Sequence, residues 1–510
     1  MKFTHRIAAT ALALITACGG AQTTQTTTAS SAPPIASSAP PPGNVRASSS
    51  GTIERQAPPA PGPRRDIHFP AIARSNLRNG LEVNVVEYHT LPVVHLRLVA
   101  RNAGGSADPA NLPGLASFTG DMLKEGTRAH TSAQLADAIE FVGGQMQVST
   151  TPDTTTISVS VLRDHLETAL GLINEMVTTP TFPQIEIDKL RRREIDRLTQ
   201  EEEDPGWLSR RAFYAAAYGS HPYSRFDTSR DALRRITRND IVAFHRARFV
   251  AGSMFLAVVG DVRPAEFTPV AERILGRIRR GSAPAVSFPA IPARTAREVI
   301  IVDRPESAQS MIRIGNTAIR RNSDDWVQLA VANQILGGEA SSRLFMDLRE
   351  RRSLTYGAYS RVTGTIDVGT FQASGAVRTP VTAQALDAFF EHLDRIVREA
   401  APEPETELSR AYLVDSFPLA IETPGDLAGL LVDLRTYGLP DTYWDSYRTH
   451  ISAVTPAEAL QAAQHYVHPQ QSVIVIVGNA QVFQEHARHY GPVRVVDVNG
   501  HVERELGPLS

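Results

Sequence analysis

The stretch GLASFTGDMLKEGT, residues 114–127, places polar groups on one side of a predicted helix. Three apolar residues recur at i, i+3 and i+7, the spacing of a buried helical face: Leu115, Phe118 and Met122. Ser117, Gly120 and Asp121 fall on the opposite face, so a hydroxyl and a carboxylate four residues apart would project from the same side. The stretch contains no histidine, the side chain that most often binds zinc or acts as a general base near neutral pH.

Two histidines elsewhere could serve as bases, His221 in GSHPYS and His245 in AFHRARF. Neither is accompanied by a cysteine nucleophile or a Gly-x-Ser-x-Gly elbow, so we expect both to have structural roles. The acidic run EEEDP, residues 201–205, is explained equally well as a solvated turn before a proline.

The elements that must position these residues alternate between strands and helices. Period-two patterns predict strands in GLEVNVVEYH, PVVHLRLVAR and TTTISVSVLRD. Helical spacing predicts helices in SAQLADAIEFVGG, which ends in glycines, and in LETALGLINEMVTTPTFP, which ends in proline-bearing residues. The alternation indicates an α+β protein with two lobes.

The chain repeats part of this pattern. TRNDIVAFHRARFVAGSMFLAVVGDV begins at Thr237 and TPAEALQAAQHYVHPQQSVIVIVGNA at Thr455, and their glycines Gly260 and Gly478 keep the same offset of 218 residues. A shared offset without a gap favours a duplicated domain. We therefore predict an N-terminal domain at 67–280, a Pro/Ala/Ser-rich linker at 281–296 and a C-terminal domain at 297–495.

Length and charge limit the classes of function. A chain of 510 residues exceeds what one hydrophobic core usually organises, which agrees with two domains. A formal net charge of −2 gives no reason to expect nucleic acid as a partner.

The N-terminus has the layout of an export signal. MKFTHRIAATALALITACGG begins with basic residues, continues with a short apolar run and has a small residue before Cys18, the single cysteine of the chain. ITAC resembles a bacterial lipobox, so we predict a signal peptide at 1–18, lipid attachment at Cys18 and a disordered Pro/Ser/Thr/Ala-rich tether at 19–66. An ordinary signal peptide with a chance cysteine is the alternative. The lipid would be the only membrane anchor, and the body would face the periplasm or cell envelope.

Four landmarks, in order, resemble the insulinase and mitochondrial processing peptidase family of zinc metalloproteases. They are LRNGLEVNVVEYHTLPVVHLRLVARNAGG, GLASFTGDMLKEGT, YGSHPYSRFDTSRDALRRITRNDIVAFHRARFVAGSMFLAVVGDV and ILGGEASSRLFMDLRERRSLTYGAYS. The resemblance implies two homologous tandem α/β-sandwich domains. It also implies that this pair faces a second pair across a closed chamber where unfolded peptides are cut.

In active members, the resemblance implies an H-x-x-E-H helix that binds zinc, with the glutamate as general base. Here Ser117 and Asp121 stand in place of the histidines, Gly120 replaces the base, and Glu194 in RRREIDRL matches the further glutamate ligand. A hydroxyl and two carboxylates are a poor zinc site. We therefore expect a site that is inactive by itself and no metal bound by this chain. Glu194 could equally be an ordinary residue of a helix surface.

The second half keeps Arg349 and Tyr356 in the segment that most resembles the family. In paired bacterial members, a subunit without the zinc motif contributes an arginine and a tyrosine to the active chamber of its partner. A guanidinium fork can hold a peptide carbonyl or carboxylate, and a phenol can donate to an oxyanion. Packing at an interface is the structural alternative for both.

Three hypotheses follow from these residues. The chain is a non-catalytic subunit of a heteromeric zinc peptidase, supplying Arg349 and Tyr356 to a same-family partner that carries H-x-x-E-H and the zinc. Alternatively, it is a scaffolding or binding lipoprotein. The third hypothesis is a self-sufficient metallohydrolase with an altered site around Asp121 and Glu194.

Overall fold

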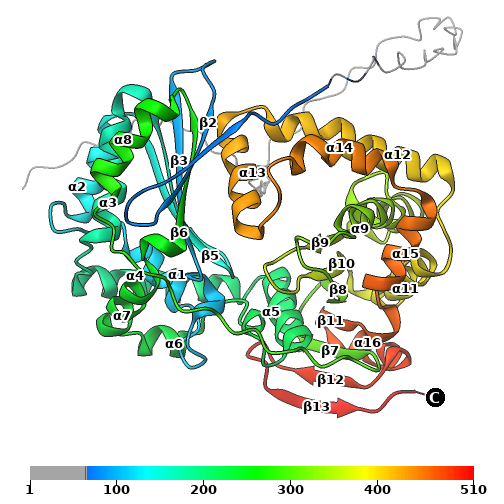
Figure 1. Cartoon of the computed structure of the whole chain (residues 1–510). Helices are drawn as coiled ribbons and strands as arrows, with labels where there is room; N and C mark the ends of the chain where they lie inside the picture. The colour runs from blue at the N-terminus through cyan, green and yellow to red at the C-terminus, as the bar shows by residue number, and fades with distance from the viewer. Residues whose placement is uncertain (1–61, 63, 65, 510) are drawn as a thin grey trace, which may run out of the picture. The chain divides into compact units, whose positions relative to one another are not determined.

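The computed structural model describes residues 62, 64 and 66–509. The predicted signal peptide, Cys18 and nearly all of the predicted tether lie outside the described residues. From Arg64 onward, the chain builds two β-sheets, each covered by helices (Figure 1). None of the described helices combines the length and the apolar character needed to cross a membrane.

The first sheet has six strands in the order β1-β2-β6-β3-β5-β4. The strands are β1 (Ile72–Asn76), β2 (Glu82–Glu87), β3 (Val93–Arg101), β4 (Gln145–Thr150), β5 (Thr154–Leu162) and β6 (Met254–Gly260). β2 and β6 run parallel, and the other neighbours are antiparallel. In β3 the alternate residues Val94, Leu96 and Leu98 are fully buried, which confirms the period-two prediction for this segment.

The second sheet has seven strands in the order β13-β12-β7-β11-β8-β10-β9. The strands are β7 (Glu298–Asp303), β8 (Gln309–Thr317), β9 (Thr355–Thr363), β10 (Thr370–Arg378), β11 (Val473–Gly478), β12 (Val493–Val496) and β13 (Val502–Leu506). Because β12 and β13 belong to this sheet, it continues beyond residue 495, where the sequence analysis placed the end of the second domain.

The two sheets share one topology. The order β2-β6-β3-β5-β4 recurs as β7-β11-β8-β10-β9 with the same parallel and antiparallel pairs. The helices before β6 and β11 both begin with a capping box, at Thr237 and Thr455. The strands end at Gly260 and Gly478, and a Cβ added at Gly260 would lie 2.1 Å from the carbonyl oxygen of Val93. Two homologous tandem α/β domains are thus confirmed.

The helices fill the connections between the strands. Those of the first half are α1 (Leu115–Met122), α2 (Ser132–Phe141), α3 (Leu166–Thr178), α4 (Gln184–Glu201), α5 (Pro205–Tyr218), α6 (Arg230–Arg235), α7 (Arg238–Arg248) and α8 (Pro264–Leu275). Those of the second half are α9 (Trp326–Asn333), α10 (Arg343–Phe345), α11 (Thr382–Arg398), α12 (Glu403–Ser416), α13 (Pro424–Tyr437), α14 (Tyr443–Ala453), α15 (Pro456–Tyr466) and α16 (Ala480–Ala487). The helices predicted from SAQLADAIEFVGG and LETALGLINEMVTTPTFP are α2 and α3.

One helix from each half packs on the sheet of the other half. α5 packs on β8 and β11 of the second sheet, and the Tyr218 hydroxyl donates to the carbonyl of Val368 at 2.7 Å (Figure 1). In return, α13 packs on β3 and β6 of the first sheet, where Leu427 and Leu431 join a buried cluster with Phe255. Each sheet therefore has one face covered by its own helices and the other covered by a helix of the other half.

Candidate functional site

The start of α1 is fixed by residues that come from elsewhere in the first half. The buried Asp108 carboxylate accepts hydrogen bonds from the backbone N–H groups of Gly114, at 2.6 Å, and Ala116, at 2.7 Å. Gly114 has a φ of 90°, and a Cβ there would lie 2.4 Å from the Cβ of Thr228. Only glycine fits this conformation beside Thr228, so the orientation of α1 is closely determined.

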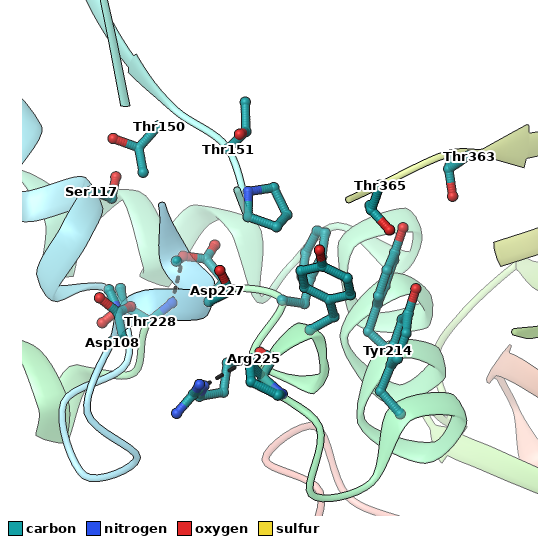
Figure 2. A pocket seen from close by; sticks show the side chains of 18 of the residues that line it. Asp108, Ser117, Thr150, Thr151, Tyr214, Arg225, Asp227, Thr228, Thr363 and Thr365 are labelled. Carbon is teal, nitrogen blue, oxygen red and sulfur yellow. Dashed lines mark hydrogen bonds between the residues drawn. The ribbon is translucent and has the colours of Figure 1, made fainter. Parts of the chain in front are cut away.

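A cavity of about 690 Å³ opens beside α1. Its walls are formed by α1, the β4–β5 turn, α4, α5 and the loop after α5. Thr363 and Thr365, at the end of β9, complete the wall from the second half of the chain. Figure 2 shows Ser117 and Asp108 on one side, with Tyr214 and Thr365 on the other. Both halves therefore shape this cavity.

The structure brings together three of the four residues predicted for a degenerate zinc site. Ser117, Asp121 and Glu194 all line the cavity. Gly120 is buried, and a Cβ added there would lie 2.9 Å from the Thr150 hydroxyl oxygen. A larger residue at this position would have to displace that threonine side chain.

Arg197 is the main site residue that the sequence analysis missed. Its Nε donates to the Glu194 carboxylate at 2.8 Å, and its two terminal nitrogens donate to the two oxygens of Asp227 at 3.1 and 3.0 Å. Burial alone would lower the pKa of Arg197, but the hydrogen bonds with Asp227 and Glu194 raise it above its ordinary value. The guanidinium therefore stays charged and pairs with both carboxylates. Its spacing of three residues from Glu194 on one helix was a readable signal, whereas Asp227 comes from another segment.

Asp121 is the carboxylate of this cavity that lacks a partner in the described part of the chain. Burial raises its pKa to about 6, opposed by Lys124 and reinforced by Glu194. The pKa of Asp108 is also raised by burial, to about 7, although its two backbone hydrogen bonds work in the opposite direction. The cavity thus holds two carboxyl groups whose ionisation is costly.

These side chains do not fit a zinc ion. Zinc in proteins prefers imidazole and thiolate ligands, whereas the cavity offers a serine hydroxyl, the Asp121 carboxylate and a Glu194 already bound to a guanidinium. Across residues 62, 64 and 66–509, no three His, Cys, Asp or Glu side chains are grouped so that they could hold a metal. With Gly120 in place of the glutamate, the helix also offers no carboxylate at the position of the base.

Both histidines lie in packed surroundings. His221 is buried, with its Nε2 3.1 Å from Asp367 and its Nδ1 accepting from the backbone N–H of Tyr223. His245 packs against the ring of Phe249 at a centroid distance of 5.1 Å, and burial lowers its pKa to about 4. Neither lines the cavity beside α1.

The acidic run before α5 is engaged in local contacts. Asp204 accepts from the backbone N–H groups of Gly206 and Trp207 at the start of the helix. Glu203 forms an ion pair with Arg304 at 2.7 Å.

Arg349 and Tyr356 lie away from this cavity. Arg349 is on a π-helical turn, Met346–Arg351, where its guanidinium lies 4.7 Å from the centre of the Phe345 ring and the side chain is 47% exposed. Tyr356 is near the start of β9, an edge strand of the second sheet, and is 87% exposed. Thr363, which does line the cavity, is seven residues further along β9, or about 23 Å at the usual strand rise.

Two family models match the chain. Residues 85–226 match the model described as insulinase, peptidase family M16, and residues 235–413 match the one described as the peptidase M16 inactive domain. Together the two matches span more than half of the 510 residues.

Similar proteins and structures agree with this match. A protein named an uncharacterized zinc protease from Mycobacterium bovis is 27% identical over 423 residues, covering 81% of this chain and 96% of that protein. One with the same description from Streptomyces coelicolor is 25% identical over 422 residues, covering 79% and 89%.

A solved structure described as a peptidase M16 inactive domain from Pseudomonas fluorescens superposes with a TM-score of 0.74 at 26% identity, covering 80% of this chain and 98% of that one. A protease from Helicobacter pylori shares the fold, with a TM-score of 0.76 at 19% identity over 81% of this chain and 100% of that one. On the two model matches, the ordered sequence landmarks and the duplicated fold, the chain belongs to the insulinase family, peptidase family M16.

Proposed function

We propose that this chain is a non-catalytic subunit of a heteromeric, zinc-dependent peptidase that acts on unfolded peptides. Its partner is a same-family subunit that carries H-x-x-E-H and the zinc, and this chain contributes Arg349 and Tyr356 to the chamber of the partner. The chain itself binds no metal. It is exported and held at the membrane by a lipid on Cys18.

The observation that carries the proposal is the exposure of Tyr356. A tyrosine that is 87% exposed on an edge strand buries almost none of its ring, and its hydroxyl has no hydrogen-bond partner in the described part of the chain. A large aromatic residue in this position adds little to the stability of the isolated chain, because its ring is not buried. It is, however, accessible to a neighbouring molecule. Arg349 is half-exposed, packs its guanidinium on Phe345 and forms an exposed ion pair with Glu350, its Nε lying 3.4 Å from a carboxylate oxygen. An exposed pair of this kind is weak, so a bound peptide can compete for the guanidinium.

The cavity beside α1 supports the non-catalytic part of the proposal. Arg197 already forms hydrogen bonds and ion pairs with Glu194 and Asp227, and Gly120 supplies no base. A self-sufficient hydrolase around Asp121 and Glu194 would need both carboxylates free, and only Asp121 is without such a partner among the described residues.

The two donated side chains have complementary roles in this proposal. The planar Arg349 fork holds a carbonyl or carboxylate of the bound peptide, which fixes the position of the chain to be cut. The Tyr356 hydroxyl donates to the oxygen of the scissile carbonyl as negative charge develops on it. Zinc in the partner would activate the attacking water.

The test reconstitutes the chain with the same-family H-x-x-E-H subunit encoded nearest to it and measures cleavage of an unfolded peptide. The chain alone should be inactive, and the mixture should be active. Tyr356→Phe should lower turnover by about 10²-fold while leaving assembly intact on size-exclusion chromatography, because only one donor is lost. Arg349→Lys should also impair turnover, because a point charge cannot replace a planar fork.

Matched controls are available on exposed helices. Tyr412 on α12 is 47% exposed, and Arg192 on α4 is exposed; neither side chain has a hydrogen bond or ion pair among the described residues. Tyr412→Phe and Arg192→Lys should leave turnover unchanged. Full activity of both the Tyr356 and Arg349 variants in assembled complexes would refute the donor role and leave a scaffolding subunit.

A further inference from the structure

The turn that carries Arg349 has an unusual backbone. Residues Met346–Arg351 form a π-helical turn, and the N–H of Arg352 donates to the carbonyl of Asp347, five residues earlier, at 2.9 Å. The chain leaves the turn through Ser353, which has a φ of 53° although it carries a side chain. A π-helical turn is rare, and a left-handed backbone at a residue other than glycine costs free energy. Both persist only where the surrounding contacts determine them.

Asp347 makes the contacts that join this turn to α11. Its buried carboxylate oxygen Oδ2 lies 2.9 Å from Nε2 of His392 on α11 and 3.0 Å from Nε of Arg352. Arg352 also pairs with Glu391, the neighbour of His392 on α11. The other carboxylate oxygen, Oδ1, lies 3.4 Å from a terminal nitrogen of the exposed Arg351. The turn is thus tied to α11 by polar contacts to one buried carboxylate.

The charge states make these contacts directional. Burial would raise the pKa of Asp347, but the hydrogen bonds from His392 and Arg352 keep it below its ordinary value, so the carboxyl is ionised near pH 7. Burial lowers the pKa of His392, so the ring is neutral and its one N–H, on Nε2, donates to the carboxylate. Apolar side chains of similar size often stabilise a fold as well as a buried ionic network does. They do not impose a direction, whereas charge-assisted hydrogen bonds do.

We propose that Asp347 is a positioning residue for Arg349. Through His392 and Arg352 it fixes the π-helical turn against α11, and Arg349, two residues later on that turn, is presented from a fixed backbone with its guanidinium over Phe345. This role rests on the donor function proposed for Arg349. Asp347 itself is 1% exposed, so it acts on a bound peptide only through the residue that it positions.

Hydrogen exchange of the chain alone tests whether Asp347 fixes the turn. In Asp347→Ala, the amides of residues 347–354 should exchange at least about tenfold faster than in the natural chain, because bonds to a charged group are lost, while other segments stay unchanged. His392→Leu should have the same effect. His392→Gln should not, because its amide can donate from near the position of Nε2. Unchanged exchange of this segment in both Asp347→Ala and His392→Leu would overturn the proposal.

A matched control lies on the same helix. Asp387 of α11 pairs with Nε2 of His486, at 2.7 Å, and accepts from the Tyr490 hydroxyl. Asp387→Ala removes a carboxylate–histidine pair of the same kind away from the turn. It should leave both the exchange of residues 347–354 and the turnover of the reconstituted pair unchanged.

A double-mutant cycle in the reconstituted pair tests whether Asp347 acts through Arg349. Asp347→Ala should lower peptide turnover by about tenfold in an otherwise natural chain, because displacing a positioning group is costly. In an Arg349→Ala chain, which has no guanidinium to position, the same substitution should lower turnover by less than about twofold. A tenfold loss in both backgrounds, with assembly intact on size-exclusion chromatography, would mean general damage and would overturn the positioning role.

The two measurements separate failure of the positioning role from failure of the proposed function. An inactive natural pair would refute the proposed function, and the exchange rates, measured without the partner, would still decide whether Asp347 fixes the turn. Faster exchange with unchanged turnover in an active pair would leave the proposed function standing and would overturn the positioning role.

Discussion

Replacing Asp121 with Asn should stabilise the protein, and the gain should depend on pH. The pKa of this carboxyl is raised from its ordinary value of 3.8 to about 6, chiefly by burial. Well below pH 3.8 the group is protonated in both the folded and the unfolded chain, so it does not favour either state. As pH rises from 4 to 6, the unfolded chain releases the proton first, and folding becomes less favourable.

The size of the effect follows from the two pKa values. At 1.36 kcal/mol per pKa unit, the shift corresponds to at most about 3 kcal/mol above pH 6, and relaxation of the side chain toward the cavity reduces this to about 1–3 kcal/mol. An Asn side chain has nearly the same shape and no charge to bury, so the variant avoids this cost. The difference in stability between Asp121→Asn and the natural chain should be smallest at pH 4, where only the unfolded carboxyl has begun to ionise, and reach its plateau near pH 7.

Urea unfolding of the two proteins at pH 4, 5, 6 and 7 measures this difference. The difference between the two midpoint urea concentrations, multiplied by a common m-value, gives the difference in the free energy of unfolding at each pH. Other groups with shifted pKa values, Asp108 among them, cancel because they are present in both proteins. Asp196→Asn, which neutralises an exposed carboxyl on α4, is the matched control and should show no pH-dependent gain. A difference that stays flat with pH, or that grows toward acid, would refute the account of Asp121.

Three further predictions concern the same site and the anchor. Gly114→Ala should lower stability by about 2–4 kcal/mol in urea unfolding, because the φ of 90° and the adjacent threonine leave no room for a Cβ; a neutral effect would contradict the described start of α1. Arg197→Met should cost about 1–3 kcal/mol by leaving Glu194 and Asp227 without their cation, and a thermal shift smaller than that of an exposed arginine variant would argue against the pairing. Cys18→Ser should move the protein from the membrane fraction to the soluble fraction or block its processing, and an unchanged distribution with the same mature mass would exclude lipidation.

Local patterns predicted the elements well. The strands β2, β3 and β5 and the helices α1, α2 and α3 follow directly from residue spacing, because these segments each bury one side in their own half. The duplication was visible in the offset between Thr237 and Thr455 because the helix caps and the strand ends are both repeated.

The exchanged helices could not be predicted in the same way. Periodicity shows that α5 and α13 each have an apolar face, but it does not say which sheet that face contacts. For the same reason, the wall that Thr363 and Thr365 add to the cavity was not foreseen. Both features depend on contacts between the two halves of the chain. Residue spacing within one segment does not show which distant segment it contacts.

The site was predicted in part. Ser117, Asp121 and Glu194 were placed together through a family resemblance, and the structure does bring them to one cavity. Arg197 was missed although it lies one helical turn from Glu194, because a basic residue on a charged helix has many possible partners. Its second partner, Asp227, is 30 residues away in sequence and follows α5, so only the tertiary structure shows that one guanidinium binds both carboxylates.

The exchange of α5 and α13 also constrains the order in which the chain can mature. When the first half emerges from the ribosome, the face of its sheet formed by Val86, Val99 and Phe255 has nothing to cover it until α13, which begins 164 residues after the end of β6, has been synthesised. During that interval α5 has no sheet to cover either. A chain of this design should depend on a holding chaperone, and a truncation before α13 should yield an aggregating fragment, although each half has the size of an ordinary domain.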